Sequence, residues 1–129
     1  MNEPTFLSLE QVKELHADAI ARFGGTLGVR DEDGLESAVM HPRNVFFYGS
    51  GDLFEIAAAY AFHIAEAQAF LDGNKRAAAA AALTFLQDNG VNVAFKAMPR
   101  LYEAMIGIAK REMDKGGLAA VLRALAGGK

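Results

Sequence analysis

The sequence predicts an all-α fold, a compact bundle of about six helices with one short flexible flap loop. Apolar residues recur at helical spacing along most of the 129 residues, and almost no segment alternates as a strand would. Two capping-box patterns mark helix starts, and glycines mark several helix ends. The length and the hydrophobic content of 52% indicate a single domain over residues 1–129 with a core of its own.

The first helix is predicted over Leu9–Phe23, where apolar residues form a stripe at 3.6 spacing. Ser8 is an N-cap residue, and Gln11 three positions later completes a capping box. The helix is expected to stop at Gly24 and the glycine that follows it. His16 lies near the apolar stripe, so we expect a buried or half-buried histidine there.

A glycine-rich polar stretch over 26–33 predicts a loop or short hairpin. A short helix over 34–40 must end before Pro42, because the residue before a proline disfavours helical geometry. Three consecutive aromatic residues at 46–48 fall in a short connection, where we expect them to fill the core beneath it.

Asp52 and Glu55 form a second capping box, which opens a central helix over 53–67. Its apolar face is so wide that we expect burial nearly all round. A further helix is predicted over 75–89, and its alanine run at 77–82 indicates a thin helix that other helices approach closely.

The C-terminal part predicts two more helices. Residues 91–95 are too few for more than an extended connection, and Pro99 occupies the favoured first position of a helix ending near Glu112. Gly116 and Gly117 are expected to break the chain before a last helix over 118–126.

Composition excludes several classes of protein. The chain has no cysteine, which excludes a disulfide scaffold and a cysteine-based zinc site. The net charge of −3 argues against general nucleic-acid binding, which normally needs a basic surplus. No apolar run reaches the roughly 20 residues of a membrane span, and the N-terminus lacks signal-peptide features. We therefore expect a cytoplasmic protein without membrane or nucleic-acid partners.

The chemistry is concentrated in the hinge between the two long central helices, residues 68–76. Asn74 is a good N-cap residue for the second helix, with Lys75 and Arg76 in its first turn. Each cation at a helix N-terminus costs about 0.3–1 kcal/mol, which Asp72 offsets in part. A positive helix start with free N–H groups favours phosphate binding, the alternative being two solvated surface cations.

At this hinge the chain resembles the Fic/Doc family, whose signature reads H-x-F-x-D-G-N-[GK]-R. The matching residues are Phe70, Asp72, Gly73, Asn74, Lys75 and Arg76. Lysine at position 75, in place of glycine, resembles the Doc (death-on-curing toxin) branch. Flanking stretches at 21–25, 34–38, 52–55 and 85–90 match as well, so the resemblance covers residues 9–125. It departs at Gln68, the position of the signature histidine, and at Ala69, where proline is usual.

The resemblance implies that the hinge binds ATP with Mg²⁺ and transfers the terminal phosphate to a hydroxyl of a target protein such as elongation factor Tu. By position, the resemblance implies that Asp72 holds Mg²⁺. It implies that Asn74, Lys75 and Arg76 contact phosphate oxygens, and that Gly73 belongs to the same nucleotide-binding turn. Phe70 is implied to anchor the loop in the core. Residues 26–33 are implied to form the flap, beside which a disordered antitoxin tail folds on binding.

Gln68 is the difficulty for this function, because an amide does not titrate. Loss of a general base typically costs about 10²–10⁴ in rate. His63 lies five residues upstream, about 140° round the helix and ~7.5 Å along it, so it should face elsewhere. The sequence alone does not place His16 or His41 relative to Gln68, so it does not show whether either could act as the base.

Several functions remain open at this point. The chain is predicted to be a slow Doc-like toxin, with Gln68 in place of the base. Alternatives are a catalytically inactive Fic/Doc binding module and a Fic-type enzyme that transfers AMP. Gln68 could also be an alteration, made or selected, that allows a host to tolerate a toxic protein. A helical interaction domain without nucleotide is a further alternative, but it leaves the charged cluster at 72–76 unexplained.

Overall fold

The computed structural model describes residues 3–127, and this part of the chain is all-α, as predicted. Its elements are α1 (Leu9–Phe23), α2 (Glu32–Met40), α3 (Pro42–Phe47), α4 (Leu53–Ala67), α5 (Asn74–Asp88), the 3₁₀ turn η1 (Phe95–Ala97), α6 (Met98–Ala109) and α7 (Lys115–Gly127). Between residues 3 and 127, none of these helices combines the length and apolarity needed to cross a bilayer.

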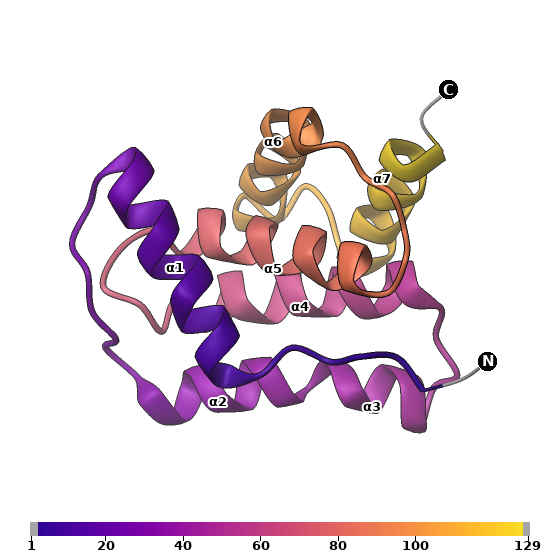
Figure 1. The fold of residues 1–129 in the computed structure, drawn as a ribbon, viewed down its shortest axis with the longest axis horizontal. Coiled ribbons are helices and arrows are strands. Elements are labelled where there is room, and N and C mark those ends of the chain that lie inside the picture. Colours follow the sequence, from indigo (N-terminus) through magenta and orange to yellow (C-terminus); the bar gives the residue numbers. More distant parts are fainter. Residues whose placement is uncertain (1–2, 128–129) are drawn as a thin grey trace.

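Helices α4 and α5 pack against each other in the middle of the bundle (Figure 1). Helices α1 and α6 pack on α5, whereas α2, α3 and α7 pack on α4. Residues 56–61 of α4 are buried in an unbroken run, and five of the six alanines at 77–82 are buried on α5. Small side chains let the backbones approach closely, so the predicted thin central helix is confirmed.

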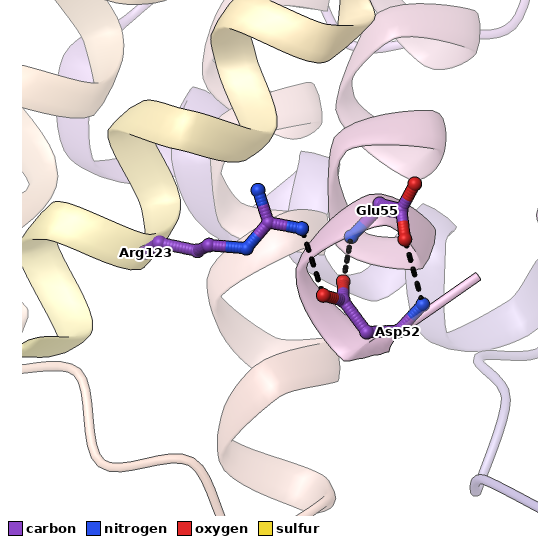
Figure 2. A network of polar contacts seen from close by, with 3 residues as sticks. All are labelled: Asp52, Glu55 and Arg123. Carbon is purple, nitrogen blue, oxygen red and sulfur yellow. Dashed lines mark hydrogen bonds and ion pairs between the residues drawn. The ribbon is translucent and has the colours of Figure 1, made fainter.

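Both predicted capping boxes are present. Ser8 and Gln11 bond reciprocally at the start of α1, and Asp52 and Glu55 do so at the start of α4. Figure 2 shows that Arg123 of α7 also donates to Asp52, with 2.7 Å between Nη2 and Oδ2. Burial alone would raise the pKa of Asp52, but hydrogen bonds from Arg123 and the Glu55 backbone outweigh it and hold this pKa below its usual value.

The aromatic residues at 46–48 correct a prediction. The segment is not a plain connection, because Pro42 opens the short helix α3 at a position where its missing N–H costs nothing. Only Phe46 packs against the core, while Phe47 is 53% exposed and Tyr48 is 86% exposed. On a helix these consecutive residues point in different directions, so they cannot all face inward.

Two helix starts also differ from the prediction. Helix α2 begins at Glu32 rather than Gly34, because the Asp31 carboxylate accepts the Gly34 N–H and caps the helix earlier. Helix α7 begins at Lys115 and contains both glycines expected to break the chain. Asp114 accepts the Gly117 N–H at 2.8 Å, and this capping bond offsets the low helix propensity of glycine.

Candidate functional site: the loop between α4 and α5

The loop that joins α4 to α5 starts with a strained residue. Gln68 ends α4 in the left-handed region, with φ 46° and ψ 42°. A non-glycine residue there costs about 1–2 kcal/mol, so other contacts must hold it. The carbonyl of Gln68 accepts a hydrogen bond from Nη2 of Arg30 at 2.5 Å.

The predicted flap, residues 26–33, lies along this loop. Val29 and Phe70 form an antiparallel bridge. The Ala69 carbonyl accepts the Arg30 N–H at 2.7 Å, and the Gly28 carbonyl accepts the Leu71 N–H at 3.0 Å. The flap is therefore bonded to the loop through backbone groups on both sides of the bridge.

Asn74 has a different role from the predicted one. The N-cap of α5 is Gly73, with φ 74°, and no side chain caps this helix within residues 3–127. The Asn74 side chain instead reaches back to Phe70, accepting its N–H at 3.0 Å and donating to its carbonyl at 3.1 Å. Asn74 closes the loop, and the first-turn N–H groups of α5 are left without a side-chain cap.

A buried histidine of α1, His16, contacts the loop on the side of the core. His16 of α1 is 2% exposed, as the sequence predicts, and its ring stacks on Phe70 at 3.7 Å and 7°. Its Nε2 lies 2.7 Å from the carbonyl oxygen of Asp72. A carbonyl only accepts, so Nε2 carries the proton and donates. Because this nitrogen is buried and already donates its proton to a backbone carbonyl, it is not available to act as a base in place of Gln68.

Asp72 presents an exposed carboxylate at the tip of the loop. Its Oδ1 accepts the Gly73 N–H at 3.1 Å, and its Oδ2 accepts the Thr26 N–H of the flap at 3.2 Å. Residues 3–127 contain no group of three acidic, histidine or cysteine side chains that would hold a metal alone. Mg²⁺ commonly uses one or two carboxylates together with substrate phosphates and water. Asp72 fits that mode of binding.

Two hollows meet at this loop. An open cleft of about 1180 Å³ extends from Gln68 and Asp72 to the connection between α6 and α7. A smaller one of about 160 Å³ lies between the loop, α1 and α6, where Arg76 and Tyr102 line it. Lys75 lines both hollows. An anion held there would meet the positive start of α5 from either side.

Neither cation of the first turn forms an ion pair within the described part of the chain. Lys75 is half-buried, and Arg76 lies against the rings of Phe23 and Tyr102. In the lining of the smaller hollow, Lys75 and Arg76 outnumber Asp72, so this part of the site is positive although the chain has a net charge of −3. The large cleft is also lined by Glu66, Glu112 and Asp114.

His63 is on another face of α4, as the helical geometry predicts. Its ring packs against His41, with 3.9 Å between centroids, and its Nε2 lies 3.2 Å from the Lys115 ammonium. Burial, together with the nearby His41 and Lys115, lowers the pKa of His63 to about 4. It does not line the large cleft that contains Gln68.

The fold and this site define a class, and the chain belongs to the Fic/DOC family, whose model matches residues 6–86. It is similar to "Protein kinase doc" of Escherichia phage P1, at 36% identity over 122 residues, 94% of this chain and 95% of that protein. It is also similar to "Toxin Doc" of Mycolicibacterium smegmatis, at 40% identity over 122 residues, 92% of each chain. The resemblance to the Doc branch is thereby confirmed.

The structure brings Gln68, Asp72, Gly73 and Lys75 to the large cleft, and Arg76 to the adjoining hollow. Phe70 is 1% exposed and lies in the core beneath the loop. Sequence reasoning missed the contacts made to the loop by other segments: His16, Phe23, Arg30 and Tyr102. The Ala-Arg-Phe-Gly-Gly stretch at 21–25, matched as part of the family resemblance, was the one signal that pointed to Phe23.

Proposed function

We propose that this chain is a Doc-type toxin of a toxin–antitoxin system that uses ATP and Mg²⁺ to phosphorylate a hydroxyl of a translation protein resembling elongation factor Tu. The observation that carries the proposal is the uncapped positive start of α5, where Lys75 and Arg76 have no carboxylate partner within residues 3–127. Such a helix start binds phosphate through N–H groups and charge. One relative is named a kinase and another a toxin, and both match over nearly the whole chain.

Each motif residue has a role in this proposal. Lys75 and Arg76 neutralise phosphate oxygens, and the α5 N–H groups add donors at the same place. Asp72 supplies a carboxylate for Mg²⁺, which would neutralise further phosphate charge and align the nucleotide. The Asn74 side chain keeps the loop closed through Phe70, so we assign it a positioning role rather than a direct phosphate contact.

In the transfer itself, a bond forms between the target hydroxyl oxygen and the terminal phosphorus. The bond from that phosphorus to the bridging oxygen breaks, and ADP leaves. Gln68 does not accept the hydroxyl proton, which must pass to water or to a phosphate oxygen. A loose transition state depends on a base less than acyl transfer does, so a slow reaction is expected rather than none.

The test is transfer of label to purified elongation factor Tu from ATP carrying it in the terminal or in the α-phosphate. Wild type should transfer terminal label slowly, and Gln68→His should raise the rate by a factor on the order of 10²–10⁴. The matched control is Gln68→His combined with Asp72→Ala, which keeps the imidazole and removes the carboxylate. That variant should lose the gain.

Other results would change the assignment. Label from the α-phosphate would indicate AMP transfer, the reaction of Fic-type enzymes. Mg–ATP binding without transfer by wild type or Gln68→His would indicate an inactive binding module. No calorimetric heat with Mg–ATP, or equal heat from wild type and Arg76→Ala, would favour a helical interaction domain.

We propose that the partner is an antitoxin whose disordered tail folds beside the flap in the cytoplasm. Leu27 and Leu71 are 62% and 52% exposed on the flap and the paired loop, and they offer apolar surface to such a tail. Because the Gln68 amide cannot accept a proton, expression of the wild-type chain without antitoxin should slow growth far less than expression of Gln68→His. Growth arrest by wild type that Asp72→Ala abolishes would show that Gln68 does not disable the chain.

A further inference from the structure

The Arg76 guanidinium lies over two aromatic rings from helices that are distant in the sequence. Its Cζ is 3.9 Å from the centroid of Phe23, at the end of α1, and 4.5 Å from that of Tyr102, on α6. No carboxylate within residues 3–127 pairs with it. The two rings are therefore the contacts that fix its position in the described part of the chain.

A guanidinium that stacks on a ring uses its face and leaves its edge free. The ring quadrupole attracts a cation above the ring plane, whereas the N–H donors that bind phosphate lie in the guanidinium plane. An arginine held by rings therefore remains able to bind an anion, which an arginine in a bidentate ion pair cannot do. Arg76, Tyr102 and Lys75 line the same hollow at the start of α5.

Phe23 is exposed to an extent that core packing does not explain. The side chain is 59% exposed although it ends the apolar stripe of α1. An exposed phenylalanine at the last position before Gly24 gains little from burial, but it gains from a cation above its face.

We propose that Phe23 and Tyr102 are positioning residues that hold Arg76 ready for a phosphate of the bound nucleotide, an inference that rests on the proposed function. A free arginine side chain loses considerable rotamer entropy when it binds. The two rings restrict the Arg76 side chain before the nucleotide binds, so less rotamer entropy is lost on binding. The affinity for Mg–ATP therefore depends on the rings although neither ring carries a charge that attracts phosphate.

The experiment is calorimetric titration of the full chain with Mg–ATP, using aliphatic and aromatic replacements at both positions. Phe23→Leu and Tyr102→Leu should each weaken binding about two- to five-fold, the effect of one exposed cation–π contact. Phe23→Tyr and Tyr102→Phe keep a ring and should bind like wild type. Thermal unfolding of each variant shows that it is folded.

A double-mutant cycle separates positioning from general packing. In an Arg76→Ala background, Phe23→Leu should have no further effect on the affinity, because the group that the ring positions is gone. An equal loss in both backgrounds would overturn the inference, as would wild-type affinity in both leucine variants. Tighter binding by the leucine variants would also overturn it, since the rings would then withhold Arg76 from the nucleotide.

The same titrations distinguish failure of the proposed nucleotide site from failure of the rings to position Arg76. Absence of Mg–ATP binding by wild type refutes the nucleotide site and the inference together. Binding that is lost in Arg76→Ala but unchanged in Phe23→Leu and Tyr102→Leu keeps the nucleotide site and refutes the role of the rings alone.

Discussion

His16 lies outside the sequence motif and contacts the loop through both its ring and its Nε2–H, and two substitutions separate these contributions. His16→Phe keeps a ring that can stack on Phe70 and removes the Nε2–H that donates to the Asp72 carbonyl. His16→Ala removes both the ring and the hydrogen bond. The side chain is 2% exposed, so neither loss is replaced by direct contact with solvent at that position.

The expected costs follow from these contacts. The hydrogen bond should contribute about 1 kcal/mol to the free energy of unfolding, and His16→Phe loses this amount. His16→Ala also loses the stacking contact, about 0.5–1.5 kcal/mol, and leaves a cavity. We expect a total of about 3 kcal/mol for His16→Ala.

Urea unfolding measures these differences, and calorimetry with Mg–ATP measures the effect on the site. His16→Phe should weaken Mg–ATP binding although it is the milder change in stability, because Asp72 loses the bond that fixes its backbone. Val12→Ala is the matched control, since Val12 is fully buried on the same helix. It should cost about 2 kcal/mol or more without affecting Mg–ATP binding.

If His16→Phe unfolds at the same urea concentration as wild type and binds Mg–ATP equally well, the Nε2–H bond does not hold the loop. If Val12→Ala and His16→Ala weaken the affinity to the same extent, loss of stability alone explains the effect and His16 has no specific role at the site.

Three further changes test other parts of the structure. The pKa of His63 is lowered to about 4, so the free energy of unfolding should fall as the pH drops from about 6.5 to 4, because only the unfolded imidazole binds a proton there; His63→Gln should flatten that profile in urea titrations. Asp52→Ala removes the α4 cap and should cost about 1 kcal/mol in thermal unfolding, more than Arg123→Ala. Gly25→Ala places Cβ 2.9 Å from Asp72 Oδ2 at φ 116°, so Mg–ATP affinity should drop.

Local patterns in the sequence predicted most of the helices. Ser8 with Gln11 and Asp52 with Glu55 were identified because a capping box is complete within four residues. The start of α7 was missed because a single acceptor, Asp114, overrides the glycines that follow it. Such an override depends on the geometry of one turn, which composition does not report.

The candidate site was predictable only in the residues that are contiguous in the chain. The motif predicted Asp72, Lys75 and Arg76 at the start of α5, but the groups that orient them come from α1, the flap and α6. These contacts span 26 to 56 positions in the sequence, from Tyr102 to Arg76 and from His16 to Asp72. The family resemblance indicated the stretch at 21–25 and the flap, but helical periodicity and spacing in a single sequence do not show which distant residues pair.

The contacts that hold the loop do not include the Gln68 side chain. Arg30 bonds to the backbone carbonyl of Gln68, and the flap bonds to the backbone of the residues that follow it. No side-chain hydrogen bond of Gln68 is found within residues 3–127. Another side chain that can adopt the same backbone geometry at position 68 should therefore leave these backbone hydrogen bonds intact. Under the proposed function, a change at Gln68 should therefore act on proton transfer and leave the cation cluster, the Asp72 carboxylate and the flap in place, so Gln68→His should raise the transfer rate without changing the affinity for Mg–ATP.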